Sequence, residues 1–274
     1  MEIKYAILGY DTLNIGDDIQ SLIVSFIIPK IDYIILRDDY DVIYDYNTGA
    51  KIMTLNEKVL LIMNCWLMQG PNYTTKDIKF PIKNKNIIPF YISTHLSPNV
   101  NELLNDECIN DYILHEPFYT RDIHTFNLLK ELNVNCHYFG CMTQLLKKEY
   151  LGQVPSNDLT ILVDCEEKFI EQYIANHPCE NIKIISHIIP TEQVHTNPLE
   201  RMNYAKSLLI LYSGAKKIIT TRLHCFLPSR AMGIDVTYNG PVNGRTQDLV
   251  NNIPNVEKLM TTFKMALNDK VDKI

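Results

Sequence analysis

The chain has 274 residues, of which 46% are hydrophobic and 21% are charged, as is typical of soluble globular proteins. Its formal net charge of −6 excludes a broad nucleic-acid-binding surface, so an anionic ligand must be held by locally clustered cations. The seven cysteines stand singly, which argues against a secreted disulfide scaffold and favours a reducing, cytoplasmic compartment. The opening segment "MEIKYAILGY" reads as a strand rather than a signal peptide, and no apolar run reaches the roughly 18–20 residues of a membrane span.

Short apolar segments rich in Val, Ile and Leu recur along the chain and are predicted to be strands. Such continuous runs, without alternation, are typical of parallel strands that are covered on both faces. The predicted strands are residues 3–10, 33–38, 58–66, 87–94, 111–116, 159–165, 182–189, 216–221 and 235–240.

Segments with helical periodicity lie between several of these strands. In residues 17–29, Ile19, Leu22 and Ile23 fall on one helical face, and Pro29 ends the run. Three further helices are predicted over residues 122–134, 199–217 and 255–271. Strands that alternate with helices indicate an α/β architecture with a largely parallel sheet.

One plausible seam divides the chain into two α/β halves. Charged residues, Gly and Pro interrupt the pattern over residues 145–158, before a fresh strand begins. We therefore expect an N-terminal Rossmann-like lobe over residues 1–150 and a C-terminal Rossmann-like lobe over residues 151–274, with a cleft between them.

The first polar junction between a strand and a helix is "GYDTLNIGDDIQ". Gly16 permits a tight turn, and Asp17 or Asp18 could cap the helix and favour its dipole. The alternative interpretation makes Asn14 and Asp17 groups that bind a sugar hydroxyl or act as a general base. The motif is too short to decide between these interpretations.

Two later junctions place cations beside the start of a helix. Arg121 precedes Asp122, which is a suitable N-cap, and it is either a surface arginine packed on the sheet or a ligand-binding group. Arg222 and His224 stand in "IITTRLHCF", where a cation disfavours the helix by roughly 0.3–1 kcal/mol unless an anion is bound nearby. For His224 the plainer alternative is a core histidine bonded to a backbone carbonyl. We favour anion binding because Arg222 lies two positions away.

Other motifs exclude several common classes of site. The chain contains no G-x-x-x-x-G-K-[ST], G-x-G-x-x-G or G-x-S-x-G sequence. Cys136, His137 and Cys141 lack a second pair at zinc-finger spacing, so no metal site is expected. Trp66 could line the cleft, although a buried aromatic residue is the simpler interpretation.

Ordered blocks over most of the chain resemble the polysaccharide pyruvyl transferase family. The blocks are "NIGDDIQS", "NCWLMQG", "PFYISTHLS", "HEPFYTRDIHTFNLLKELNVNCHYFGCMTQLL", "AKKIITTRLHCFLPSRAMGIDVTYNG" and "NGRTQDLV". The resemblance implies two Rossmann-like lobes with parallel sheets in a GT-B-like arrangement, with catalysis in the cleft.

The resemblance also implies an activity, a donor and a set of site residues. The activity is transfer of the enolpyruvyl group of phosphoenolpyruvate to a glycan or sugar acceptor, which forms a pyruvate ketal and releases phosphate without a cofactor or metal. The implied catalytic residues are His224 and Asp17, and the implied substrate-binding residues are Arg121, Arg222, Asn14, Gly16, His95 and Arg245.

Two other functions remain open at this point. One is a GT-B-type nucleotide-sugar glycosyltransferase, which would use the same helix N-terminus for a diphosphate. The other is a non-catalytic relative that binds an anion or sugar, because a fold alone does not establish an activity. Formation of a homo-oligomer is also open.

Overall fold

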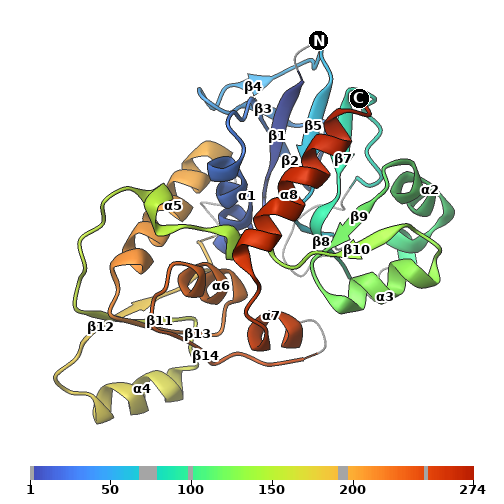
Figure 1. Cartoon of the computed structure of the whole chain (residues 1–274). Coiled ribbons are helices and arrows are strands. Elements are labelled where there is room, and N and C mark those ends of the chain that lie inside the picture. Colours follow the sequence, from blue (N-terminus) through green and yellow to red (C-terminus); the bar gives the residue numbers. More distant parts are fainter. Residues whose placement is uncertain (1–2, 68–78, 98–100, 191–196, 244–245) are drawn as a thin grey trace.

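The computed structural model describes residues 3–67, 79–97, 101–190, 197–243 and 246–274 (Figure 1). Within these residues the strands form three sheets, and helices lie between several successive strands. The expected α/β class, with parallel Rossmann-like and GT-B-like sheets, is confirmed.

The first sheet has the strand order β4-β3-β2-β1-β5-β7. Its strands β2, β1, β5 and β7 are parallel, and β3 and β4 extend one edge in antiparallel pairing. Since β1 is flanked by β2 on one side and β5 on the other, the sheet reverses its order at β1. The strands are β1 (Lys4–Gly9), β2 (Tyr33–Leu36), β3 (Ile43–Asp45), β4 (Lys51–Ile52), β5 (Val59–Ile62) and β7 (Ile87–Phe90).

The second sheet has the order β10-β9-β8-β6 and is parallel throughout its described strands. The chain passes into it twice from the first sheet, from β5 to β6 and from β7 to β8. Its elements are β6 (Trp66–Leu67), β8 (Ile92–Leu96), η1 (Asn101–Leu104), α2 (Asp106–Leu114), β9 (Phe118–Thr120), α3 (Ile123–Glu131) and β10 (Cys136–Tyr138).

The strand predicted over residues 111–116 is wrong, because most of this segment belongs to helix α2. The Asn105 side chain accepts a hydrogen bond from the backbone N–H of Cys108 and caps the helix. The negative charges of Asp106 and Glu107 in the first turn interact favourably with the positive end of the helix dipole. The apolar residues at the end of this helix account for the incorrect strand prediction.

The third sheet, formed by the second half of the chain, has the parallel order β12-β11-β13-β14. Here the order reverses at β11, which lies between β12 and β13. Its elements are β11 (Leu159–Val163), α4 (Glu167–Asn176), β12 (Asn181–Ile185), α5 (Pro198–Gly214), β13 (Lys217–Thr220), α6 (Leu223–Ala231), β14 (Val236–Tyr238) and α7 (Gln247–Asn251), preceded by η2 (Met142–Leu145) and η3 (Lys148–Leu151).

Two helices pack against elements that are distant from them in the sequence. Helix α1 (Ile15–Ile27) buries Ile19 and Ile23 in a cluster with residues of α5, α6 and β11. Helix α8 (Val256–Val271) returns to the first sheet, where Phe263 packs in a cluster with Ile7 of β1 (Figure 1). The predicted boundary between residues 150 and 151 falls inside η3, and residues from both sides of it pack together in the clusters around α1 and α8.

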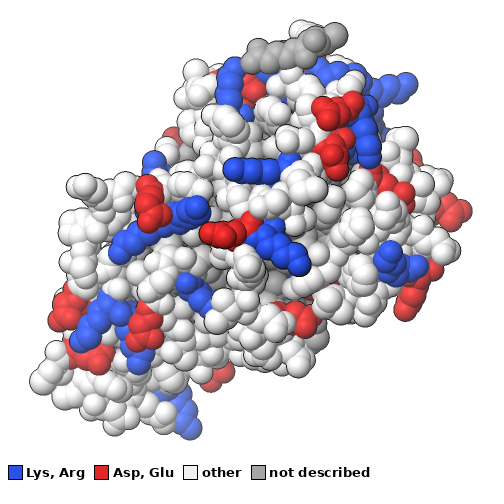
Figure 2. Space-filling model, in the orientation of Figure 1, with Lys and Arg blue, Asp and Glu red and all other residues white. Residues whose placement is uncertain are grey.

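The surface shows no single-sign region on the face drawn in Figure 2, where Lys and Arg are interspersed with Asp and Glu. Among the helices of the described residues, none is long and apolar enough to cross a bilayer.

Candidate active site

A cavity of about 330 Å³ lies where strand ends of both halves meet. Asn14 follows β1, Arg121 follows β9, and Arg222 follows β13, so three strands of three sheets point their carboxyl ends at it. Ligand sites of open α/β sheets occupy this position, next to the place where the strand order reverses. The cavity is lined by Asn14, Asp17, Trp66, Arg121, His187, Thr221, Arg222, Leu223, His224, Tyr238, Pro241, Asn243 and Thr246.

Five of the predicted site residues line this cavity. The five are Asn14, Asp17, Arg121, Arg222 and His224.

Of the predicted site residues that the structure describes, Gly16 and His95 are not in the wall of the cavity. A Cβ atom at Gly16 would lie 3.2 Å from the Cβ of His224, so the glycine allows His224 to approach helix α1. His95 is buried in β8, and its ring centroid lies 5.8 Å from that of Trp66, which does line the cavity. Arg245 lies outside the described residues.

The start of helix α1 differs from the predicted capping pattern. Asn14 is the N-cap, with its side-chain oxygen accepting from the backbone N–H of Gly16 at 3.1 Å. Asp18 instead forms a buried ion pair with Arg201 of helix α5. The interpretation of Asp17 or Asp18 as the cap is therefore wrong.

Asp17 is nearly buried and accepts two hydrogen bonds. Thr12 Oγ1 donates to its Oδ2 at 3.0 Å, and Gln20 Nε2 donates to its Oδ1 at 3.2 Å. Burial raises the pKa of Asp17 above its usual range, against the nearby charges of Arg37 and Arg121. A carboxylate with a raised pKa is better suited to accept a proton than an exposed one.

Arg121 is only 3% exposed, so the alternative of a surface arginine is wrong. Its Nη1 donates to Gln20 Oε1 at 3.2 Å, and its buried Nε has no hydrogen-bond partner within the described part of the chain. Because Gln20 also donates to Asp17, one amide links the guanidinium to the carboxylate. A buried guanidinium with unused N–H groups at a cavity wall is suited to bind an anion.

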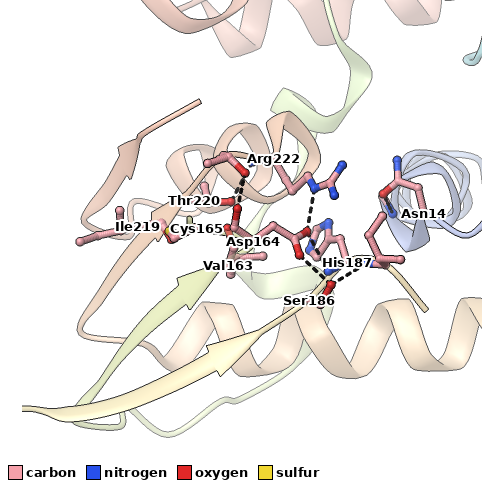
Figure 3. A network of polar contacts seen from close by, with 12 residues as sticks. Asn14, Val163, Asp164, Cys165, Ser186, His187, Ile219, Thr220 and Arg222 are labelled. Carbon is pink, nitrogen blue, oxygen red and sulfur yellow. Dashed lines mark hydrogen bonds and ion pairs between the residues drawn. The ribbon is translucent and has the colours of Figure 1, made fainter. Parts of the chain in front are cut away.

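Arg222 is the N-cap residue of helix α6 and makes no side-chain cap bond. Its Nε instead donates to Asp164 Oδ2 at 2.6 Å, while its terminal nitrogens point away from this carboxylate (Figure 3). The Asp164 charge thus offsets the unfavourable position of a cation at a helix N-terminus. The two terminal nitrogens are the groups that Arg222 can offer to a ligand.

Asp164 is fixed at the end of β11 by several donors (Figure 3). Ser186 Oγ donates to its Oδ1 at 2.6 Å, and the backbone N–H of His187 donates to its Oδ2 at 3.0 Å. Burial opposes ionisation of Asp164, but these hydrogen bonds and the Arg222 charge together lower its pKa below the usual range. The carboxylate therefore stays charged and holds Arg222 in place.

His95 belongs to a buried hydrogen-bonded group behind the cavity wall. Its Nδ1 lies 2.6 Å from Asp122 Oδ2 and 3.1 Å from Thr125 Oγ1. Burial alone would raise the pKa of Asp122, but the hydrogen bond and charge of His95 and the charge of Arg121 lower it to about 2. Asp122 also caps helix α3, as predicted, by accepting from the Thr125 N–H.

Sequence reasoning missed three groups of the site and underrated a fourth. Asp164 ends a predicted strand at a point where the sheet order reverses, so the rule that located Arg222 could have found it. His187 was read as part of a strand, but β12 ends at Ile185. Gln20 lies within the helix predicted over residues 17–29, where no local pattern marks it as a site residue. Trp66 is partly exposed and lines the cavity, so its interpretation as a buried aromatic residue is wrong.

No cluster of three or more His, Cys, Asp or Glu side chains suited to a metal ion occurs among the residues that the structure describes. The polar groups at the cavity instead combine cations, neutral imidazole or amide donors and one carboxylate, a set that fits an organic anion.

Comparison with known proteins bears on the family and on the fold. Over 90% of its length the chain is similar in structure to a functionally uncharacterized protein from Klebsiella pneumoniae subsp. pneumoniae NTUH-K2044, with a TM-score of 0.54, 14% identity and coverage of 87% of that chain. No curated protein matches the sequence. The family model described as polysaccharide pyruvyl transferase matches residues 14–237, which include the cavity residues from Asn14 to Arg222 and His224. The chain therefore belongs to the polysaccharide pyruvyl transferase family.

Proposed function

We propose that the protein transfers the enolpyruvyl group of phosphoenolpyruvate to two hydroxyls of a sugar, forming a pyruvate ketal and releasing phosphate. The observation that carries this proposal is that Arg121, which follows β9, lines the same cavity as Arg222 and His224, which follow β13. Membership of the family supports the reaction class.

The two arginines suit a small donor with two anionic groups. Arg222 uses only its Nε on Asp164, and Arg121 uses Nη1 on the neutral Gln20. We assign one guanidinium to the phosphate and the other to the carboxylate of the donor, since planar guanidinium groups match both anions. The cavity, at about 330 Å³, is at the small end of the roughly 300–1,000 Å³ that ligand pockets span. It fits a compact donor and the reacting edge of a sugar.

The reaction balances without an added oxidant or cofactor. A proton adds to the methylene carbon of the donor, and the adjacent carbon becomes electrophilic and is attacked by the first sugar hydroxyl. The second hydroxyl then attacks the same carbon, and the bond to the phosphate oxygen breaks. The proton that one hydroxyl loses makes up for the proton that was added to the methylene carbon. The proton that the other hydroxyl loses leaves with phosphate.

His224 and Asp17 are the proposed proton carriers. His224 lies at the start of helix α6, two residues after Arg222, and is placed to protonate the departing phosphate. Asp17 faces the same cavity from helix α1 and, with its raised pKa, is placed to accept the proton of an acceptor hydroxyl.

The proposal is tested by following phosphate release from phosphoenolpyruvate with and without sugar acceptors. We expect release that depends on the acceptor, and a loss of at least about 100-fold in kcat/KM for Arg222→Ala, because the charged contact to the donor is removed. Lys168→Ala in helix α4 removes an exposed cation that is distant from Arg222 in the sequence, and it serves as the matched control. Unchanged donor affinity and turnover in Arg222→Ala would show that the assigned role is wrong.

Thermal shift measurements separate this function from its competitors. A ligand that binds only the folded state raises the melting temperature, so phosphoenolpyruvate should stabilise the protein and a panel of nucleotide sugars should not. Stabilisation by a nucleotide sugar alone would indicate a glycosyltransferase. Donor binding without turnover on any sugar would indicate a non-catalytic relative.

The cytoplasm is the proposed location of the reaction. All seven cysteines lie in the described part of the chain and none forms a disulfide, which fits a reducing compartment.

A further inference from the structure

His187 is a buried side chain at the cavity wall to which no role has been given so far. It is 0% exposed, yet it lines the cavity between the start of helix α1 and Arg222. Its Nδ1 has no hydrogen-bond partner within the described residues. Buried polar atoms of this kind are rare in folded proteins, and an unpaired one at a cavity indicates a missing ligand or water.

The backbone of His187 is held from both halves of the molecule. Its N–H donates to Asp164 Oδ2, and its carbonyl accepts from the backbone N–H of Ile15 at 2.9 Å. Next to it, Asn14 and Ile188 form an isolated antiparallel bridge. Because the main chain is fixed between Asp164 and helix α1, the ring has a defined position relative to Arg222.

The orientation of the ring is set by Tyr212 of helix α5. The Tyr212 hydroxyl lies 2.9 Å from His187 Nε2, and the two rings are stacked with centroids 6.1 Å apart. The two nitrogens of an imidazole point in different directions, so the contact with Tyr212 turns Nδ1 away from helix α5. His187 lines the cavity, and Nδ1 is the ring nitrogen that the contact with Tyr212 leaves available.

The position of the ring proton follows from the neighbours of Tyr212. Burial keeps the pKa of Tyr212 well above its usual range, and burial raises the pKa of the adjacent Cys225 thiol to about 12. Both groups therefore keep their protons, and the imidazole nitrogen is the strongest acceptor that the Tyr212 hydroxyl meets. When Tyr212 donates to Nε2, a neutral ring must carry its proton on Nδ1.

We propose that His187 is a donor-binding residue, whose Nδ1–H donates a hydrogen bond to the anionic group that Arg222 holds. This inference rests on the proposed function for the identity of the anion, a phosphate or carboxylate of the donor substrate. Burial lowers the pKa of His187 to about 4; the charge of Asp164 opposes this shift and the charge of Arg222 adds to it. The ring is therefore neutral, and its hydrogen bond orients the anion without adding a further positive charge.

Two substitutions at this position separate the Nδ1 contact from the packing of the ring. In His187→Asn the amide nitrogen takes the place of Nδ1, whereas in His187→Gln the amide reaches the Nε2 position beside Tyr212. We expect His187→Asn to bind inorganic phosphate and phosphoenolpyruvate within about threefold of wild type, and His187→Gln to bind them about tenfold or more weakly. Titration calorimetry measures both, and circular dichroism verifies the fold.

Tyr212→Phe provides a test that does not alter the histidine. Loss of the hydroxyl removes the donor to Nε2, so nitrogen NMR of the imidazole should show a shift from the Nδ1–H to the Nε2–H tautomer. Phosphate affinity should fall in parallel. A wild-type ring that carries its proton on Nε2, or equal losses of affinity in His187→Asn and His187→Gln, would overturn the proposal.

The outcomes distinguish this inference from the proposed function. Wild-type protein that binds phosphate but not phosphoenolpyruvate contradicts the function, while the phosphate titrations still test His187. Wild-type affinity for both ligands in His187→Gln contradicts the His187 contact alone. Absence of binding to either ligand in the wild type contradicts both.

Discussion

Asp164 and Arg222, which are 58 residues apart in sequence, form an ion pair at the carboxyl ends of two neighbouring parallel strands. Asp164 has a backbone φ of +49°, a conformation that few residues other than Gly, Asn and Asp adopt readily. The carboxylate thus reaches Arg222 from an unusual backbone position, which the protein maintains at the edge of the cavity. Such strain is concentrated at functional sites in proteins.

Asp164→Asn should therefore reduce activity through Arg222. Asparagine tolerates the same backbone conformation, so the change removes the charge and leaves the fold intact. We expect kcat/KM for phosphate release to fall about 10- to 100-fold, since the guanidinium loses its charged partner and its fixed orientation.

Ser186→Ala is the control for this change, because it removes the hydroxyl bond to the other carboxylate oxygen of Asp164, together with the bond that the hydroxyl accepts from the Ile188 N–H, and leaves the Asp164 charge in place. It should lower kcat/KM by less than Asp164→Asn does. Activity of Asp164→Asn equal to that of the wild type would show that Arg222 is positioned without Asp164.

Gly16→Ala should lower activity without lowering stability. Alanine favours a helix over glycine by about 1 kcal/mol, so the free energy of unfolding should stay constant or rise. The new Cβ, however, would lie 3.0 Å from Asn14 Oδ1 and 3.2 Å from His224 Cβ, and one of them must move. We expect kcat to fall about tenfold, because displacements well below 1 Å at a reacting group are costly.

Steady-state kinetics and urea unfolding of Gly16→Ala measure the two effects separately. Ser25→Ala in the same helix, whose hydroxyl donates to the Leu22 carbonyl, controls for a general effect of substitution in α1. An active Gly16→Ala enzyme with a normal kcat would show that the approach of His224 to α1 is not needed for turnover.

The sequence predicts those parts of the site that depend on local pattern. Buried strands and their helices follow from apolar periodicity, and polar residues after a strand follow from the general position of ligands in α/β proteins. This reasoning identified Asn14, Asp17, Arg121, Arg222 and His224, which all line one cavity. The family was indicated by the resemblance of ordered sequence blocks, and the chain belongs to it.

The parts that the sequence did not predict depend on contacts between distant residues. No local pattern shows that Asp18 meets Arg201 or that Asp164 meets Arg222, because each pair is joined only by the tertiary fold. Short strands fail for a different reason. Strand β9 (Phe118–Thr120) has three residues, too few for a periodicity to be recognised.

Disruption of the Asp18–Arg201 pair should strongly destabilise the protein. Asp18 is fully buried on helix α1, and Arg201 of helix α5 binds it through both Nε and Nη2, at 3.1 and 2.5 Å. Arg201→Met would leave a buried carboxylate without its partner, which costs about 3–5 kcal/mol. Urea denaturation at neutral pH measures the loss.

The double variant Asp18→Leu/Arg201→Met tests the cause of this loss. Because it removes both charges, it should recover most of the stability that Arg201→Met loses, as exchange of a buried ion pair for apolar side chains is often neutral. A double variant that is less stable than Arg201→Met would show that the ion pair itself, rather than the isolated charge, sets the cost.

The Asp122–His95 contact should make stability depend on acid pH. The pKa of Asp122 is about 2 in the folded protein, below the value of about 3.9 of an exposed aspartate. A carboxyl group with a lowered pKa stabilises the fold above its unfolded pKa, and this contribution is lost as the pH falls through the folded value. Between about pH 4 and pH 2 the wild type should therefore lose roughly 2 kcal/mol through this group.

Asp122→Asn isolates that contribution, since asparagine is also a good N-cap and can still accept from the Thr125 N–H. Unfolding curves measured from pH 7 to pH 2 should show a less stable variant at neutral pH, with the difference from the wild type vanishing near pH 2. The exposed Asp158→Asn controls for loss of one negative charge. If the stability difference between Asp122→Asn and wild type stays constant over this range, the charge of Asp122 does not contribute to its contact with His95.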